Sequence, residues 1–270
     1  MRTTVTKNDD GVSIRALANE QSYSPFVWRL AYYAPHTQMQ RHRHDVAQFS
    51  VLLSGAARET TNKGSVDSTA MLMEFKPANF CHANKFGPDG ALLLSINIDP
   101  DDENLNDDFP FNEWRIGRGA SCQTEWAMLT HKMLSGSAEN ADELETITHD
   151  LLAGLDEIGD SVERQPAPGW LIRAREAILE TEDSIQSVAD DAGIHRVHLA
   201  RSFRRFFGQS ISQFRRDLRL SKAVRFLTHD NIAPGPASFA AGFSDQSHLT
   251  RSLRAASGLT PAALRSIFAG

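Results

Sequence analysis

The same arginine-bearing pattern occurs twice in the sequence, fifty positions apart. The first copy reads Leu-Ala-Arg-Ser-Phe-Arg from position 199, and the second reads Leu-Thr-Arg-Ser-Leu-Arg from position 249. The major groove of DNA admits one α-helix, and an arginine on such a helix can bind O6 and N7 of a guanine together. Arg201 and Arg251 hold equivalent places in the two copies, so they are the strongest candidates for base readers. The alternative is that they pair with acidic neighbours or contact phosphates.

A second group with the residue types for chemistry consists of His42, His44, Gln48 and His82. Alternate residues of a strand share a face, so His42 and His44 point the same way on any strand. Three imidazoles with one oxygen donor suit a first-row divalent metal. Gln48 offers only a neutral amide, a poorer ligand than a carboxylate, so we expect these residues to line a ligand pocket without a metal. If a metal is bound, the same four residues are its expected ligands.

Four aromatic residues are candidates for the apolar lining of that pocket: Trp28, Tyr32, Phe49 and Phe75. Packing in the protein core is the alternative for each of them. The sequence shows no Ser/His/Asp or Cys/His arrangement with convincing spacing, and it has no glycine-rich phosphate loop. These patterns therefore favour binding over catalysis.

Each copy of the arginine pattern must lie on a helix that projects from the protein surface. Before the first copy, the small residue Ala189 and the turn residue Gly193 indicate a helix-turn-helix, in which a short turn lets two helices cross steeply. Leu199 and Phe203 lie four positions apart and predict the buried face of the second helix. The residues predicted to be exposed on that helix are Arg196, Val197, Ala200 and Arg201.

The sequence after position 170 has helical periodicity throughout. The expected helices are 170–180, 185–192, 196–207, 214–227, one beginning at 237–241, 245–257 and 261–268. Two helix-turn-helix units are expected, at about 185–207 and 236–257, and the helix 214–227 would connect them.

The region before position 100 favours strands, because short apolar runs alternate there with glycine and proline. The expected strands are 26–33, 48–53, 71–75 and 91–98. Two amphipathic helices are expected after them, within 125–158. The second carries Leu144, Ile147, Leu151 and Ile158, and it could equally form a dimer seam or pack against its own β domain.

Residues 159–169 contain two prolines and two glycines and no apolar periodicity, which indicates a linker. The expected fold class is therefore α+β with two domains. Residues 1–158 would form a β-barrel or sandwich with following helices, and residues 170–270 an all-helical tandem helix-turn-helix domain.

Charge divides unevenly between these parts. Residues 170–270 hold 14 Lys+Arg against 9 Asp+Glu, a net +5, whereas the rest of the chain has a net −11. This asymmetry indicates that the helical domain meets a polyanion, with accidental surface charge as the alternative. Cys81 and Cys122 lack CxxC spacing and fit reduced thiols in a cytosol. No run approaches the roughly 20 apolar residues of a membrane span, so we expect no membrane association.

A resemblance to a known family is carried by the second copy. The run Gly-Phe-Ser-Asp-Gln-Ser-His-Leu-Thr-Arg-Ser-Leu-Arg from position 242, with Gly-Leu-Thr-Pro from position 258, strongly resembles the signature of the AraC/XylS family of transcription regulators. The resemblance covers roughly residues 170–270. In that family two recognition helices enter successive major-groove segments, which lie about 34 Å apart. The resemblance implies base contacts from Arg196, Val197, Ala200 and Arg201 on the first helix and from Gln246, Ser247, Thr250 and Arg251 on the second.

The sequence departs from the family pattern in two places. His195 stands where the family usually has a capping Ser or Thr, so the first recognition helix is expected to be less well capped or to use the histidine differently. Pro234 and Pro236 occupy the start of the second supporting helix, where the family usually has an Ile or Val pair. We expect a late helix start and a less stable second unit there.

The glycine-punctuated strands resemble the cupin-like sensory domain that many of these regulators carry. Metal-binding cupins have a glutamate where Gln48 stands. The resemblance implies a cytoplasmic, ligand-responsive DNA-binding transcription regulator, more often an activator, that forms a homodimer. Its expected partners are double-stranded DNA, an unidentified small-molecule effector and RNA polymerase; no cofactor and no enzymatic activity are expected.

Two alternatives remain open at the level of the sequence. The first is a metal-dependent cupin enzyme with an ancillary helical domain. The second keeps DNA binding but makes the β domain a partner-binding or purely dimerising module.

Overall fold

The computed structural model describes residues 2–8, 11–17, 24–62, 64–99, 112–118, 122–135, 140–154, 167–181 and 183–268. The chain forms two compact units. Unit 1 comprises Met1–Ser161 together with Leu220–Gly270, and unit 2 comprises Val162–Arg219. The linker expected at 159–169 lies largely outside the described residues, so the expected domain boundaries stay a prediction. The boundary between the two units lies between Arg219 and Leu220, within the helix Ile211–Thr228.

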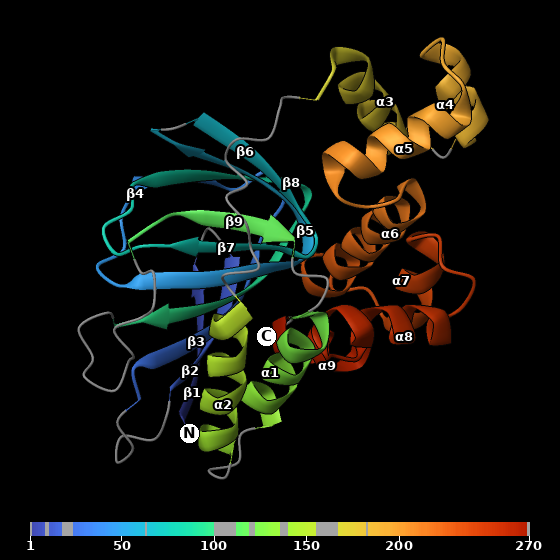
Figure 1. The fold of residues 1–270 in the computed structure, drawn as a ribbon. Coiled ribbons are helices and arrows are strands. Elements are labelled where there is room, and N and C mark those ends of the chain that lie inside the picture. The colour runs from blue at the N-terminus through green and yellow to red at the C-terminus, as the bar shows by residue number, and fades with distance from the viewer. Residues whose placement is uncertain are drawn as a thin grey trace. The chain divides into compact units, whose positions relative to one another are not determined.

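Unit 1 contains an antiparallel sheet (Figure 1). Its main strand order is β1, β2, β3, β8, β5, β7, β9, while β4 pairs with β8 and β6 pairs with β5. The strands are β1 Arg2–Asn8, β2 Gly11–Leu17, β3 Phe26–Tyr33, β4 Gln38–His42, β5 Ala47–Thr61, β6 Gly64–Thr69, β7 Leu72–Lys76, β8 His82–Ile98 and β9 Arg115–Arg118. The four predicted strands correspond to β3, β5, β7 and part of β8. Polar strands such as β4 and β6 escaped prediction because they lack an apolar run.

The two longest strands, β5 with 15 residues and β8 with 17, organise this sheet. They pair with each other along most of their length. The first part of β5 also pairs with β7 and its last part with β6, whereas β8 pairs with β4 and then with β3. Their mutual register shifts between Leu52 and Ser54 and again between Gly55 and Ala57. Such bulges bend a strand, so each long strand serves two parts of the sheet.

Alternation along β3 assigns its side chains to two different clusters. Phe26, Trp28, Leu30 and Tyr32 belong to the main apolar core. Ala31 and Tyr33 point to the other face and join a smaller cluster with Phe86 and Leu52. The period of two along a strand therefore separates a packed face from a face that borders a cavity.

Two helices cover the main core, α1 (Gln123–Ser135) and α2 (Asn140–Ala153). The indole nitrogen of Trp28 donates to the Thr148 hydroxyl at 2.9 Å, which joins β3 to α2. Trp126 of α1 packs edge-on against Phe49, with ring centroids 5.0 Å apart. These contacts fix both helices to the sheet of their own chain.

This packing decides between the two alternatives for the second amphipathic helix. Leu144 is 0% and Leu151 is 1% exposed, and both lie in the main core with Ile147. Their side chains are therefore not available for a dimer seam, and the expectation of a seam along these residues is wrong. Ile158 lies outside the described residues.

Unit 1 also contains the second helix-turn-helix. Its helices are α7 (Pro234–Ala240) and α8 (Gln246–Ser257), followed by α9 (Pro261–Phe268). The C-terminal half of α6 (Ile211–Thr228) precedes them. Val224, Leu249, Leu253 and Phe268 belong to the same buried cluster as Trp28. The apolar core of the second helix-turn-helix is thus continuous with that of the β domain.

Unit 2 contains the first helix-turn-helix and has a core of its own. Its helices are α3 (Gly169–Glu180), α4 (Ile185–Asp191), α5 (Arg196–Phe207) and the start of α6. Its buried side chains are Leu171, Ala174, Ile178, Val188, Ala189, Leu199, Phe203, Ile211 and Phe214. Gly193 adopts a left-handed φ of 65° in the turn between α4 and α5, as the sequence indicates. None of the helices in the described part of the chain is long and apolar enough to cross a bilayer.

The expectation that prolines delay the second supporting helix is wrong. Helix α7 begins at Pro234, with proline at its first position. The first N–H groups of a helix have no intrahelical partner, so a proline there removes no hydrogen bond. The Ala237 N–H already donates to the Ala233 carbonyl at 3.0 Å. Whether the second unit is less stable stays a prediction.

The close approach of β5 and β8 can be tested at Gly55. This residue has a φ of 101°, and a Cβ there would lie 2.2 Å from the Gly90 carbonyl oxygen. We expect Gly55→Ala to lower the free energy of unfolding by about 3 to 5 kcal/mol, because backbone strain and a backbone clash add. Urea unfolding followed by tryptophan fluorescence measures it.

Gly64→Ala is the matched control. Gly64 also has a left-handed φ, 129°, but nothing lies within 4 Å of the added Cβ. Gly64→Ala should therefore lower the free energy of unfolding through backbone strain alone, by about 1 to 2 kcal/mol. Equal losses in the two variants would contradict the close approach.

Candidate nucleic-acid interface and histidine cavity

The first recognition helix, α5, presents the predicted face to solvent. Leu199 and Phe203 are fully buried in unit 2, which confirms their predicted orientation. Val197 is 43% exposed despite its apolar side chain. The other predicted contact residues, Arg196, Ala200 and Arg201, are exposed.

A groove lies beside this face within unit 2. It has a volume of about 790 Å³, and its lining includes Arg196, Arg201, Arg204 and Arg215. The N-terminus of α6 also opens onto it at Ser210, whose hydroxyl accepts from the Gln213 N–H at 3.2 Å. Guanidinium groups and a helix N-terminus both favour anions, so the groove suits a phosphate backbone.

The second recognition helix, α8, exposes Gln246, Ser247 and Arg251. Thr250 is half-buried, and its hydroxyl donates to the Gln246 carbonyl at 2.8 Å. The buried face carries Leu249 and Leu253, as in the first copy. The two copies therefore bury and expose equivalent positions.

Both recognition helices are closed at their ends in similar ways. Asp245 caps α8 by accepting from the His248 N–H at 2.7 Å, and this hydrogen bond holds the pKa of Asp245 below its usual value. In α5 the cap is His195, whose Nδ1 accepts from the Val197 N–H at 3.2 Å. The histidine thus replaces the usual hydroxyl. Each helix ends at a left-handed glycine, Gly208 or Gly258.

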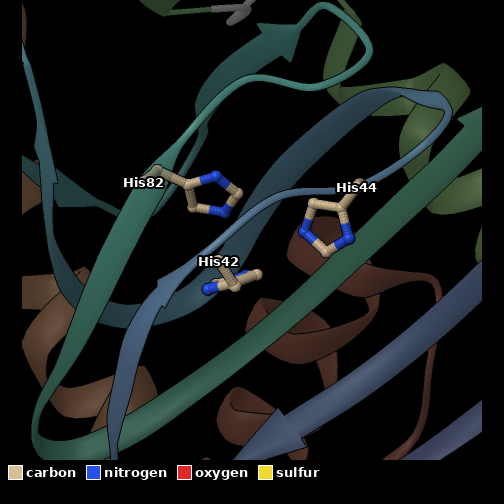
Figure 2. A group of neighbouring side chains, drawn as sticks. All are labelled: His42, His44 and His82. Atoms are coloured by element: carbon tan, nitrogen blue, oxygen red, sulfur yellow. The ribbon is translucent and has the colours of Figure 1, made fainter.

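In the β domain, three histidines converge in one cluster (Figure 2). His42 ends β4, His44 follows it, and His82 begins β8. The ring nitrogens that could bind a metal lie within 4.8 Å of one another. Gln48 on β5 lines the same cavity, and its amide nitrogen donates to the Asn97 side-chain oxygen at 3.0 Å. The structure therefore brings together all four residues that the sequence singled out.

Hydrogen bonds to backbone carbonyls orient two of the rings. His42 Nδ1 lies 2.8 Å from the Gln40 carbonyl, and His82 Nδ1 lies 3.2 Å from the Phe80 carbonyl. A carbonyl oxygen only accepts, so each Nδ1 carries the hydrogen, and the neutral ring offers the lone pair of Nε2. His42 Nε2 is buried without a hydrogen-bond partner. Burial lowers the pKa of His44 and of His82 to about 4, so both rings are neutral at pH 7.

A buried charge network forms another wall of this cavity. Lys76 Nζ lies 2.7 Å from Glu74 and 3.1 Å from Glu59. The Trp114 indole also donates to Glu74 at 2.7 Å. Burial, together with the charge of Glu74, raises the pKa of Glu59 to about 9. Against the effect of burial, Lys76 and these hydrogen bonds hold the pKa of Glu74 below its usual value.

Comparisons with known proteins bear on the helical region first. Residues 188–267 match the family model described as a helix-turn-helix domain. This match spans both copies of the arginine pattern, which the structure places on the capped, exposed faces of α5 and α8.

The C-terminal region is therefore a helix-turn-helix domain. The fold class, an antiparallel sheet followed by helices and a tandem helix-turn-helix, is as predicted.

Solved structures add two distant similarities. Oxalate decarboxylase from Bacillus subtilis is similar over 37% of this chain and 28% of its own, at 18% identity and a TM-score of 0.33. The chain thus spans about 28% of the length of that enzyme. ToxT from Vibrio cholerae is similar over 92% of this chain and 100% of its own, at 9% identity and a TM-score of 0.36. No curated protein sequence matches the chain.

Of the two alternatives for the four aromatic residues, the structure shows packing in the core and not lining of the cavity. Trp28, Tyr32, Phe49 and Phe75 are all buried in the main core. The aromatic residues that border the cavity are Tyr33 and Phe86 instead. Alternation explains the difference for β3, since Tyr32 and Tyr33 lie on opposite faces of the strand.

Sequence reasoning also missed the charged wall of the cavity. On β5 the cavity is lined by Gln48, Ser50 and Leu52, and then by Ala57 and Glu59. The change from even to odd positions follows the two register shifts in this strand. Simple alternation from Gln48 therefore places Glu59 on the wrong face. Glycine at position 55 was the available signal for a bulge.

The charge network predicts opposite outcomes for two similar substitutions. Glu74→Gln should lower the free energy of unfolding by about 3 to 5 kcal/mol, because it leaves the Lys76 ammonium without its ionised partner. Glu59→Gln resembles the protonated acid already present at pH 7 and removes the proton uptake that folding requires of Glu59, so it should not lower the free energy of unfolding. Denaturant unfolding of both variants at pH 7 measures the difference.

Glu59 should also leave a signature in the pH dependence of stability. The folded state keeps a proton that the unfolded chain releases between pH 4.5 and about 9, so wild-type stability should fall as pH rises through this range. Glu59→Gln should remove this component of the slope. A slope that is the same in wild type and variant would show that Glu59 is ionised at neutral pH.

Proposed function

We propose that the protein is a DNA-binding transcription regulator that reads two successive major-groove segments, with α5 in one and α8 in the other. The duplicated, capped helix carrying an exposed arginine at the same place supports this most directly. Arg201 and Arg251 would contact base edges, while Arg196, Gln246 and Ser247 would contact neighbouring bases or phosphates. Val197, Ala200 and Thr250 offer methyl groups of the kind that pack against thymine.

Substitution of the two arginines tests this assignment. Arg201→Ala and Arg251→Ala should each weaken binding to a selected operator by about 1 to 3 kcal/mol and relax base preference at one position. Quantitative gel shifts at fixed salt measure both effects. Arg173→Ala, which changes an exposed arginine on α3, is the control.

A lysine at each position separates base reading from phosphate binding. Arg201→Lys and Arg251→Lys keep the charge but lose the two-point hydrogen bonding to guanine. If the arginines read bases, the lysine variants lose sequence preference while the salt dependence of binding is retained. Unchanged affinity and preference in all four variants would refute the recognition-helix assignment.

We further propose that the histidine cavity is the effector site of the β domain. Its volume is about 60 Å³, well below the roughly 300 Å³ at which pockets for drug-sized molecules begin. Such a volume suits an ion with its waters or a very small molecule. Three buried polar atoms without a hydrogen-bond partner border it, on His42, Glu59 and Asn84, and such atoms favour an occupant that contacts them.

The donor set fits a first-row divalent metal. Two rings offer Nε2 lone pairs with their Nδ1 hydrogens held by carbonyls, the arrangement that orients metal-binding imidazoles. His42, His44 and His82 would hold the ion, and its binding would fix the relative positions of β4 and β8. The preference for a metal-free pocket rested on the neutral amide of Gln48, whereas the converging rings supply three nitrogen donors without it.

Metal binding has a spectroscopic test. Co²⁺ titrated into the chelator-treated full chain should bind at about one equivalent and give visible d–d bands, because imidazole ligands distort the hexa-aqua field. His82→Ala should abolish these bands. His131→Ala, on the exposed surface of α1, is the control and should leave them unchanged. The absence of bands in wild type would leave a metal-free effector pocket as the surviving form of the proposal.

The resemblance to the AraC/XylS family supports the remaining parts of the proposal. These are a cytoplasmic location beside the DNA, a homodimer, contact with RNA polymerase, and the absence of enzymatic activity. The histidine cluster also favours the rival function, a metal-dependent cupin enzyme with an ancillary helical domain. Loss of specific DNA binding in the arginine variants would support the transcription regulator. A wild type that binds no DNA sequence specifically would favour the enzyme.

A further inference from the structure

A buried polar contact joins the second helix-turn-helix to the sheet within unit 1. The Ser221 hydroxyl of α6 accepts from the Gly55 N–H of β5 at 2.9 Å. The Ser54 hydroxyl lies 3.4 Å from the same Ser221 oxygen and donates to it. Ser54 is 2% and Ser221 is 4% exposed, so water does not compete for these groups.

The place of this contact in β5 is significant. Ser54 and Gly55 lie between the two register shifts of the strand. The residues on both sides of them, Leu52 before and Ala57 and Glu59 after, line the histidine cavity. A movement of the cavity wall therefore acts on both ends of the segment Ser54–Gly55, which is hydrogen-bonded to α6.

A second contact involves the partner strand. Asp89 of β8 lies 3.4 Å from Arg225, one helical turn beyond Ser221. The backbone carbonyl of Asp89 also accepts from the Tyr32 hydroxyl at 3.2 Å. Phe86 and Leu93, on either side of Asp89 in β8, line the same cavity. Both long strands thus connect the cavity with the C-terminal half of α6.

Further contacts reach the recognition helix itself. Gln123 of α1 donates to the Ala255 carbonyl of α8 at 2.9 Å. At Gly258 the backbone comes so close that an added Cβ would lie 2.1 Å from the Ala127 carbonyl. The end of α8 is therefore packed on α1, while Gln246, Ser247 and Arg251 at its other end stay exposed.

We propose that the second helix-turn-helix is a fixed part of the sensory β domain, and that the cavity acts on α8 through the β5 bulge and Ser221. This inference rests on the proposed effector role of the cavity. A bulge holds residues outside the regular ladder, so an occupant that draws the flanking strand residues together can re-aim the Gly55 N–H. A buried hydrogen bond has few alternative partners, so α6 follows that movement.

The Gly55 amide is a direct reporter of this contact. In ¹⁵N-labelled full-length protein, Ser221→Ala should accelerate hydrogen exchange at Gly55 about tenfold, because that amide loses its acceptor. Ser257→Ala is the matched control. Ser257 is also a buried serine, but its hydroxyl donates to Leu253 within its own helix. Unchanged Gly55 exchange in Ser221→Ala would overturn the contact.

Transmission is tested by perturbing the cavity and observing α8. Zn²⁺ added to wild type, or His82→Ala without any metal, should shift the amide resonances of residues 54–57, 220–228 and 245–258. The same perturbations in a Ser221→Ala background should still shift residues 54–57 but not residues 245–258. Ser221→Cys, whose sulfur is only a weak acceptor, serves if Ser221→Ala does not fold.

The outcomes separate this inference from the proposed function. If Zn²⁺ does not bind, the metal proposal fails, and His82→Ala still tests the route. If Zn²⁺ binds and residues 245–258 do not respond, or respond equally in Ser221→Ala, the route is overturned while the metal site stands. Resonance shifts in residues 245–258 that occur only when Ser221 is present would support the inference.

Discussion

Pairing between β5 and β8 is the constraint on which unit 1 depends. These strands carry the main core on one face and the histidine cavity on the other, and their bulges let one pair of strands form both. The close approach of Gly55 to the Gly90 carbonyl is possible because Gly55 has no side chain. Pairing of β4 with the start of β8 then sets His42 opposite His82.

The two copies of the arginine pattern have acquired different surroundings. The first is stabilised by a small core within unit 2, built from α3, α4, α5 and the start of α6. The second shares the large core of the β domain. Equivalent surfaces are thus attached in unequal ways, because each copy packs against different neighbours.

Local patterns predicted the features that depend on local physics. The buried pair Leu199 and Phe203 follows from helical periodicity. His42 and His44 do converge, but β4 ends at His42, so strand alternation alone does not place His44. Glu59 escaped prediction because the bulges reverse the alternation along β5. The contact between Gly55 and Ser221 joins residues 166 positions apart, and neither residue type marks it in advance. Features that depend on strand register and on packing between distant segments therefore needed the structure.

If α5 and α8 both read DNA in one complex, each must protect its own part of the operator. Selection of binding sites from a random DNA pool, followed by hydroxyl-radical footprinting of the full-length protein, tests this. We expect two conserved blocks whose centres lie about 10 base pairs apart, each with its own protected major-groove segment. A single conserved block with a single protected segment would contradict it.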